Sequence, residues 1–351
     1  MNEASLAGVL AAIRRELPST LLDDVGWRRL LEVAGTLPAG LARRSTGFEL
    51  RLAGPAHADL FVGAVPREQD GRALLAWARR TGLGGLVQAL EGWRSGFGWL
   101  AWHASHVGLG FDAASDVLAP PCVYLAPHGS ADERPVEVPD NAFHRSPAGL
   151  VGALAALSGS PPDPAAEEEV ERTLAALPAF AEIFCAGAML SRGSVRAPRL
   201  MIRRLRPEGI GAVLAALGRP EAAERLVPVA EELQGVGAKL MLAFDVGAHA
   251  SDVVGVEAHA VRTWSEGSAE GWAPLLDALV GRGLAEPDRA EAALGVPGER
   301  GPGGPVLGLS HVKIAADPAG LRPAAKLYLG VDRPSAAIAG SRHVALAEGV
   351  A

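Results

Sequence analysis

The feature that most constrains the fold is a sequence pattern that occurs twice, in residues 105–127 and in residues 310–331. Each copy opens with Ser-His-Val and has an aspartate six residues after the histidine. Each copy then turns through small residues and proline and ends in an apolar segment with one of the chain's two tyrosines, Tyr124 and Tyr328. A pattern repeated so far along the chain indicates one supersecondary unit used more than once.

Three further segments have the same strand-turn-strand character: residues 47–65, 182–205 and 239–261. In each, two alternating arms are joined by Gly, Pro, Asp or Ser residues, which is the signal of a β-hairpin. Between the hairpins, apolar residues recur at steps of three and four, as in helices that bury one face. We expect these helices at residues 6–17, 27–34, 71–93, 147–157, 164–177, 209–217, 221–234, 272–282 and 288–294.

Five helix-hairpin units predict a fold of the α+β class. Consecutive hairpins give antiparallel neighbours, which disfavours a parallel βαβ sheet. Ten antiparallel strands can close on themselves and so remove exposed edges, with the helices covering the outside. The interior of such a barrel is wider than side chains alone readily fill, so it can hold a ligand. We therefore expect residues 1–351 to form a single domain, a ten-stranded antiparallel barrel of five αββα repeats with helices on the outside.

Charge and composition narrow the partners and the compartment. The net charge of −7 disfavours nucleic acid and anionic membranes as partners. The two cysteines, Cys122 and Cys185, do not indicate a disulfide framework, so we expect reduced thiols. The first residues lack the basic segment and apolar run of a secretory signal, and the most apolar stretch is shorter than the roughly 20 residues that span a bilayer. These features predict a soluble, cytoplasmic protein.

Five αββα units around a ten-stranded barrel resemble the plan of the ABBA prenyltransferases, which include indole enzymes of the dimethylallyltryptophan synthase type, bacterial aromatic enzymes and cyanobactin peptide enzymes. GFELRL is similar to the segment that carries a glutamate on the first hairpin of the indole enzymes, which places Glu49 at that position. AAKLYLGV resembles the Lys-x-Tyr segment that holds diphosphate, and APRLMIRRLRPEG resembles the basic second strand of the peptide enzymes. The matching residues are Lys326, Tyr328, Arg199 and Arg203. The sequence departs from the family at Cys122, where the family carries lysine, at Asp59, where it usually has arginine, and in its few tyrosines.

Glu49 is the candidate catalytic base. Glu49 and Arg51 lie two residues apart on a predicted strand and therefore share a face. In a partly dry interior the pKa of a carboxyl group can be raised, and the carboxylate can accept a proton from an aromatic acceptor during alkylation. The alternative is an exposed Glu-Arg pair that contributes a few tenths of a kcal/mol.

Basic side chains are the candidates for binding a diphosphate. Arg199, Met201 and Arg203 share one face of a predicted strand, and planar guanidinium groups bind diphosphate oxygens bidentately. Lysine offers a point charge, and tyrosine offers a hydroxyl group and a π face. A solvated edge strand or a structural cluster of ion pairs is the alternative. The residues expected to bind diphosphate are Arg51, Arg199, Arg203, Lys239, Lys313, Lys326 and Tyr328.

Aromatic and polarisable side chains are candidates for stabilising an allylic cation or lining the acceptor pocket. Those expected are Tyr124, Met201, His259 and Trp102, with ordinary core packing as the alternative. His103 and His106 are not spaced as metal ligands, and the sequence has no P-loop and no aspartate-rich box. We therefore expect no metal site, no required cofactor and no obligatory Mg²⁺.

These features together predict a prenyltransferase of secondary metabolism. The donor would be dimethylallyl diphosphate or a longer prenyl diphosphate, and the acceptor an indole-like aromatic compound or a peptide side chain. Two alternatives remain: a non-catalytic ligand-binding barrel, and a peptide-binding barrel whose mouth admits a side chain. Glu49, Arg199 and Lys326 facing one interior would favour the enzyme. The acceptor, the prenyl chain length, the regiochemistry and the oligomeric state are left open.

Overall fold

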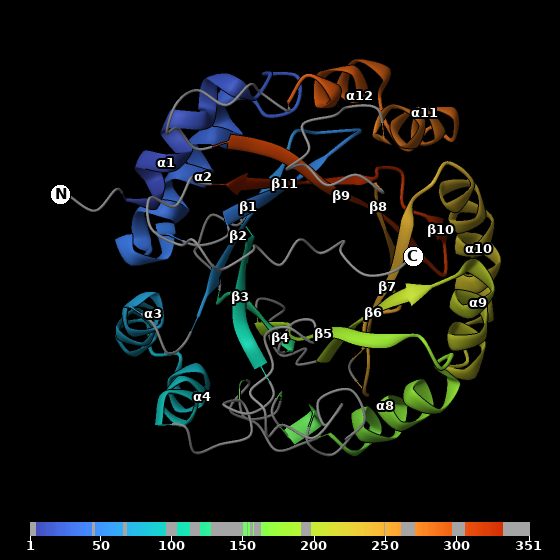
Figure 1. The fold of residues 1–351 in the computed structure, drawn as a ribbon, viewed down its shortest axis with the longest axis horizontal. Coiled ribbons are helices and arrows are strands. Elements are labelled where there is room, and N and C mark those ends of the chain that lie inside the picture. The colour runs from blue at the N-terminus through green and yellow to red at the C-terminus, as the bar shows by residue number, and fades with distance from the viewer. Residues whose placement is uncertain are drawn as a thin grey trace.

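A computed structural model describes residues 5–43, 46–65, 69–95, 104–112, 120–127, 150–152, 154, 157, 163–190, 198–248, 250–260, 271–296 and 306–332. These residues form a ring of β-strands surrounded by helices (Figure 1).

The strands form one antiparallel sheet that closes on itself. They are β1 Thr46–Arg51, β2 Ala58–Ala64, β3 Ala104–Asp112, β4 Cys122–Pro127, β5 Glu182–Ala188, β6 Pro198–Leu205, β7 Lys239–Asp245, β8 Val254–His259, β9 Val306–Asp317, β10 Gly320–Leu321 and β11 Lys326–Asp332. Their order is β10-β9-β11-β1-β2-β3-β4-β5-β6-β7-β8, and β8 also pairs with β9. Because β10 has only two residues, the closed barrel has ten long strands, which confirms the predicted fold class.

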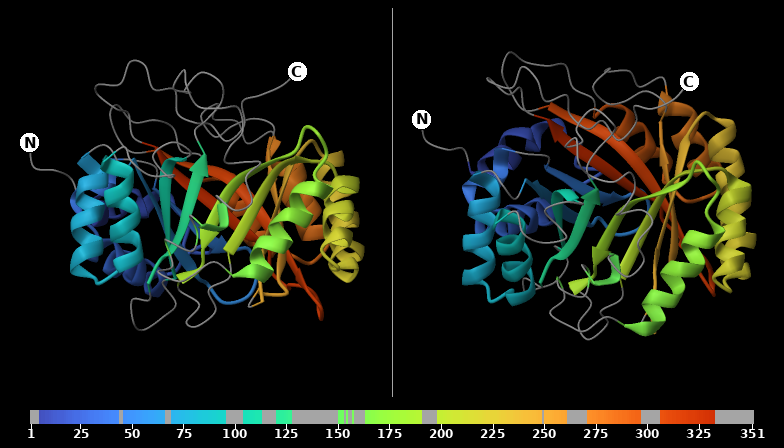
Figure 2. Two further views of the ribbon diagram at one scale, coloured as in Figure 1. Left: turned by 90° about the horizontal axis from the view of Figure 1, so that it is seen from below. Right: turned by 60° about the horizontal axis from the view of Figure 1, so that its bottom comes forward.

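The helices lie outside the barrel, and the side views show them standing along its outer face (Figure 2). They are α1 Leu6–Ile13, α2 Asp24–Thr36, α3 Gln69–Arg80, α4 Gly84–Ser95, α8 Pro164–Ala176, α9 Pro207–Ala216, α10 Pro220–Gly235, α11 Ala273–Gly281 and α12 Pro287–Leu294, with 3₁₀ turns η1 Arg14–Glu16 and η2 Ala39–Arg43. Each helix from α8 to α12 has a proline in its first turn, where the missing N–H costs nothing. No helix in the described part of the chain has the length and apolar character needed to cross a membrane.

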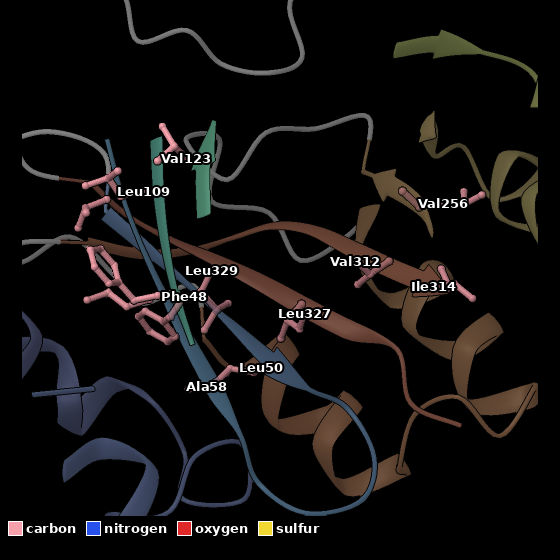
Figure 3. Packing of buried hydrophobic residues seen from close by; sticks show 14 of the residues in the cluster. Phe48, Leu50, Ala58, Leu109, Val123, Val256, Val312, Ile314, Leu327 and Leu329 are labelled. Carbon is pink, nitrogen blue, oxygen red and sulfur yellow. The ribbon is translucent and has the colours of Figure 1, made fainter. Parts of the chain in front are cut away.

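The main hydrophobic core lies between the strands and the helices. Phe48 and Leu50 of β1 and Leu327 and Leu329 of β11 are buried there side by side (Figure 3). Trp27 of α2 meets Phe48 edge-on, with ring centroids 6.0 Å apart. Each such buried side chain contributes about 1.5–3 kcal/mol to stability. Since successive strand residues point to opposite faces, the residues between these outward-facing ones face the interior of the barrel.

The observed elements follow the predicted order and differ from it in detail. The helix predicted at residues 71–93 is two helices, α3 and α4, because Gly82 adopts a φ of 74° and ends α3. The helix predicted at residues 147–157 lies largely outside the described residues. The short strand β10 was not predicted.

The two copies of the sequence repeat occupy equivalent hairpins but differ in strand register. In the second copy, Tyr328 lies opposite His311, whereas in the first copy Tyr124 lies opposite Gly108. His106 lies opposite Ala126 instead. The shared Ser-His-Val segment therefore places its histidine beside the tyrosine in one hairpin only.

Candidate functional site

Charged and aromatic side chains occupy the interior face of the barrel. On β6, Arg199, Met201 and Arg203 are partly buried and alternate with fully buried residues that pack against the helices. Glu49 on β1 lies between two such outward-facing residues, and Lys326 shares the inward face of β11 with Tyr328. The residues predicted to distinguish an enzyme from a binding module thus all face one interior.

Glu49 is held by two interior side chains. It is 4 % exposed, accepts a hydrogen bond from the Tyr328 hydroxyl and forms an ion pair with Lys326. Burial favours the neutral acid, but Lys326 and these hydrogen bonds outweigh burial and hold the pKa of Glu49 below its usual value. The predicted rise in this pKa is therefore wrong: the carboxylate is ionised because a lysine faces it.

Glu257 on β8 forms a second buried ion pair. Lys313 Nζ lies 2.9 Å from Glu257 Oε1, and His311 Nε2 lies 3.6 Å from Oε2. Burial favours the neutral acid, but Lys313 and His311 lower the pKa of Glu257 to about 2. Glu257 Oε2 and His259 Nε2 are buried without a hydrogen-bond partner among the described residues. Such atoms are costly unless a ligand or solvent satisfies them.

The two arginines of β6 are held apart. Arg199 Nε lies 2.7 Å from Asp245 Oδ1, whereas Arg203 pairs with Glu182 and lies 5.0 Å above the ring of Phe184. Four residues of strand separate them, which corresponds to about 13 Å. The prediction that they share one face is confirmed, but in this structure they do not converge as one clamp.

The chain has three lysines, and all lie on barrel strands. Lys313 and Lys326 face each other across β9 and β11. Burial lowers the pKa of Lys313, and the charges of Arg199 and Lys326 add to this fall despite its partner Glu257, so all three charges act on the same interior. We call Arg199, Lys313 and Lys326 the cation cluster.

Of two other predicted diphosphate ligands, Arg51 lies beside this cluster and Lys239 does not. Arg51 is partly buried and lies opposite Lys326 in the β1–β11 pairing. Lys239 is exposed at the start of β7, opposite His259, and lies outside the cluster. Lys239 differs from the other two lysines because it is exposed at the end of its strand. The alternation of side chains along a strand does not predict that exposure.

Five rings form a continuous aromatic band across five strands. Their ring centroids are 6.3 Å apart for Tyr124 and Phe61, 5.8 Å for Phe61 and Tyr328, 4.0 Å for Tyr328 and His311, and 4.7 Å for His311 and His259. Burial lowers the pKa of His311 to about 3 and also lowers that of His259. Both imidazoles are therefore neutral near pH 7 and present uncharged π faces.

The remaining predicted pocket residues have different outcomes. Met201 lies partly buried between the two arginines of β6, opposite Cys185. Trp102 lies outside the described residues. Sequence reasoning did not assign Phe61, His311, Glu257 or Asp245 to the site, although reading every second residue of each predicted strand would have selected them.

A separate polar cluster lies at the start of β2 and the end of β3. His57 Nε2 lies 2.9 Å from Asp59 Oδ1, and the ligand atoms of His57, Asp59 and Asp112 all lie within 4.8 Å of one another. Burial raises the pKa of Asp59, and Glu49 and Asp112 add to this rise, although the hydrogen bond from His57 opposes it. The sequence analysis does not predict this group, because only the strand register brings Asp59 and Asp112 together.

The fold and this interior define an αββα barrel of the kind that prenyltransferases adopt. No family model and no curated protein matches the sequence. Among solved structures, AnaPT from Neosartorya fischeri has a TM-score of 0.60 at 12% identity, covering 95% of this chain and 94% of that one. The prenyltransferase PriB has a TM-score of 0.56 at 13% identity, covering 92% and 94%. The 6-dimethylallyltryptophan synthase of Micromonospora olivasterospora, solved with DMASPP and Trp, has a TM-score of 0.55 at 17% identity, covering 93% and 96%.

These similarities extend over nearly the whole of each chain. They confirm the predicted resemblance to the prenyltransferase barrel at the level of fold. At 12–17% identity they do not assign a substrate to this chain.

Proposed function

We propose that this protein transfers an allylic prenyl group from its diphosphate to an aromatic acceptor inside the barrel. The observation that carries the proposal is the convergence of the cation cluster, an ionised Glu49 and the aromatic band on one interior face. These are the three groups that prenyl transfer requires: one for the leaving diphosphate, one for the proton and one for the allylic cation.

The cation cluster would bind the donor's diphosphate. Each of its members already pairs with a carboxylate: Arg199 with Asp245, Lys313 with Glu257, and Lys326 with Glu49. These pairs orient the basic groups before the donor arrives, so that they can stabilise charge where the C–O bond of the donor breaks. Arg51, which lies opposite Lys326, and the Tyr328 hydroxyl, which donates to Glu49, are further candidates for this contact. Basic side chains alone can provide this contact, without an obligatory metal.

The aromatic band would stabilise the allylic cation. A cation is attracted to the face of an aromatic ring, and the attraction is stronger when water is excluded. Because His311 and His259 are neutral, they add π surface without adding a repulsive positive charge. Neutral histidine rings would therefore provide π surface for the allylic cation in a chain that has two tyrosines.

Glu49 would accept the proton that the alkylated ring loses. In the structure its pKa is low because Lys326 faces it, which makes it a weak base. Donor diphosphate that contacts Lys326 would share the lysine's charge and leave Glu49 less stabilised, so its pKa would rise. Sharing one lysine would therefore couple donor binding to activation of the base.

The acceptor side of the site favours a molecule with a hydrogen-bond donor. Glu257 Oε2 and His259 Nε2 are buried and have no hydrogen-bond partner among the described residues, and the carboxylate can accept a bond from an indole N–H. The comparison structure with DMASPP and Trp supports a prenyl diphosphate donor and an aromatic acceptor. An indole-like acceptor is therefore proposed before a peptide side chain.

The test is incubation of the full chain with dimethylallyl diphosphate and a panel of indoles, phenols and short peptides, followed by mass spectrometry. The expected result is the mass gain of one prenyl unit on an indole. Arg199→Met should weaken diphosphate binding about tenfold, while Arg203→Met, whose guanidinium lies with Glu182, should have a much smaller effect.

Glu49→Gln separates catalysis from binding. It should keep diphosphate affinity and lose about a hundredfold or more in turnover, because a positioned base contributes on that scale. If no acceptor gains a prenyl unit and calorimetry detects no diphosphate binding, the enzyme proposal fails and the ligand-binding barrel is favoured. A prenylated peptide without a prenylated indole would move the acceptor assignment to peptides.

A further inference from the structure

Asp245, which pairs with Arg199 in the barrel interior, is also held from outside the barrel. It lies at the end of β7 directly opposite Arg199, and its Oδ1 accepts a hydrogen bond of 2.7 Å from Arg199 Nε. The Asp245 side chain is 1% exposed. Its backbone carbonyl oxygen accepts a further hydrogen bond, of 2.8 Å, from Arg219 Nη2. One aspartate therefore joins an interior arginine to an arginine that lies among the helices.

Arg219 lies on the helix side of the barrel wall. It is the residue that precedes α10, and α9 and α10 lie outside β6 and β7 in Figure 1. The Arg219 guanidinium carbon lies 5.7 Å from the ring centroid of Phe244. Phe244 is fully buried and comes directly before Asp245 on β7, so the two side chains point to opposite faces of the sheet. Arg219 thus contacts β7 from outside, whereas Arg199 meets it from inside.

Helix α8 holds the backbone that follows Asp245. The N–H of Gly247 donates to Glu169 Oε2 at 2.9 Å, and the same carboxylate oxygen lies 3.8 Å from Arg219 Nη2. Gly247 has a φ of 99°, a left-handed conformation that favours glycine at this turn. The backbone is therefore held both at the Asp245 carbonyl and just beyond it.

We propose that Arg219 is a positioning residue that orients Arg199 through Asp245. An arginine side chain has many rotamers, and a fixed carboxylate beside its Nε–H selects among them. Because Asp245 takes the Nε–H, the N–H groups on the two Nη atoms of Arg199 are those that could meet phosphate oxygens. Loss of Arg219 would free the carbonyl of Asp245, and the Arg199 guanidinium would lose its fixed orientation.

The exposure of the two partner carboxylates separates Arg199 from Arg203, the other inward arginine of β6. The side chain of Glu182, the partner of Arg203, is 20% exposed, against 1% for Asp245. A solvated ion pair holds its members less firmly than a buried one. The arrangement around Arg219 therefore gives the interior one firmly oriented guanidinium. Its consequence for donor binding rests on the proposed function, whereas the orientation of Arg199 does not.

The first measurement is nuclear magnetic resonance of the arginine Nε–H groups in the full chain, with isotopically labelled arginine and no substrate. Arg199→Lys identifies the Arg199 signal by its loss, and the wild type should show slow hydrogen exchange at this group. In Arg219→Met the exchange should be at least about tenfold faster, because a hydrogen bond between charged groups contributes on that scale. Arg219→Lys, which keeps the charge and a donor, should restore part of the protection.

Arg282→Met is the matched control. Arg282 also lies among the outer helices and also binds one carboxylate, that of Glu232, and one backbone carbonyl, that of Pro228. These contacts join α10 to the end of α11 and involve neither Asp245 nor Arg199. The control should leave hydrogen exchange at the Arg199 Nε–H unchanged, even where its melting temperature falls as far as that of Arg219→Met.

The second measurement is calorimetric titration with inorganic diphosphate. Arg219→Met should weaken binding about fivefold, less than the loss of Arg199 itself, because a misplaced group keeps part of its contact. Arg282→Met should bind diphosphate as the wild type does. Both measurements are made at a temperature at which circular dichroism shows every variant folded, and Arg219→Lys carries the same comparison where Arg219→Met does not fold.

The two measurements separate this inference from the proposed function. Diphosphate binding by the wild type, with the same Arg199 exchange in the wild type and Arg219→Met, would overturn the positioning role and leave the donor site standing. Equally faster exchange in Arg282→Met would also overturn it, because it would show a general loosening of the fold. A wild type that binds no diphosphate, but whose Arg199 exchange responds to Arg219→Met alone, would support the positioning role and count against the proposed donor site.

Discussion

Replacing Lys326 with methionine tests the electrostatics of the interior most directly. Methionine keeps the length of the lysine stem and removes its charge, which leaves Glu49 buried with Tyr328 as a remaining partner. Breaking a fully buried pair costs about 3–5 kcal/mol, and exposed pairs contribute under about 1 kcal/mol. Glu49 is 4 % exposed but the Lys326 side chain is 38% exposed, so we expect a loss of about 2 kcal/mol near neutral pH.

The sign of the pH dependence follows from the direction of the pKa shift. In the wild type the pKa of Glu49 lies below 4.5, so its contribution stabilises the fold above pH 4.5 and is lost as the pH falls through the folded-state pKa. In the Lys326→Met variant, burial should raise that pKa above 4.5, so ionisation opposes folding at higher pH. The difference in stability between the two proteins should therefore be large at about pH 8 and small at about pH 4.

The measurement is urea unfolding followed by circular dichroism at both pH values. Adding Glu49→Gln to Lys326→Met should restore part of the lost stability, because it removes the unpaired buried charge. Arg14→Met breaks an exposed pair with Asp24 and serves as the control, with an expected loss under about 1 kcal/mol at either pH. An equal loss for Lys326→Met at both pH values, or no restoration in the double variant, would refute the reasoning.

Two further perturbations test the aromatic band. His311 binds a proton in the unfolded chain below about pH 6.5 but in the folded chain only near pH 3, so stability should fall as the pH drops below 6.5. In the His311→Phe variant, the free energy of unfolding should fall much less than in the wild type between pH 6.5 and 4.5, a range in which Glu257 does not yet titrate. An equal fall in the two proteins, measured by urea unfolding, would contradict the assignment. Gly187→Ala would place a Cβ 2.8 Å from a ring atom of Tyr124, so it should cost about 1–3 kcal/mol and alter the near-ultraviolet circular dichroism. Gly281→Ala is the control, because an added Cβ there meets no atom within 4 Å outside its own helix backbone and chain neighbours; equal melting temperatures for the two variants would count against this packing.

The order of helices and hairpins was readable from the sequence because it depends on local patterns. Alternation along each arm, turn residues between arms and prolines at helix starts depend on neighbours in the chain. Closure of the ring could be inferred as well, since ten antiparallel strands would otherwise leave two exposed edges. The same alternation placed Glu49 with Arg51, and Arg199 with Arg203, on one face of each strand.

Contacts between distant strands could not be read from the chain. The pairing of Lys326 with Glu49 reversed the expected direction of the Glu49 pKa shift, and it depends on β1 meeting β11 at the closure of the barrel. Asp245 and Glu182 hold the two arginines of β6 apart, although strand alternation treats both arginines alike.

The sequence by itself determined the order of helices and hairpins and which side chains of a strand share a face, because both follow from local periodicity. Only the tertiary structure decided which inward charges meet, because that depends on strand register. A shift of one residue in register changes every cross-strand partner while leaving the local pattern intact. The electrostatics of the interior, and with it the chemistry proposed for this protein, is therefore a property of the closed barrel.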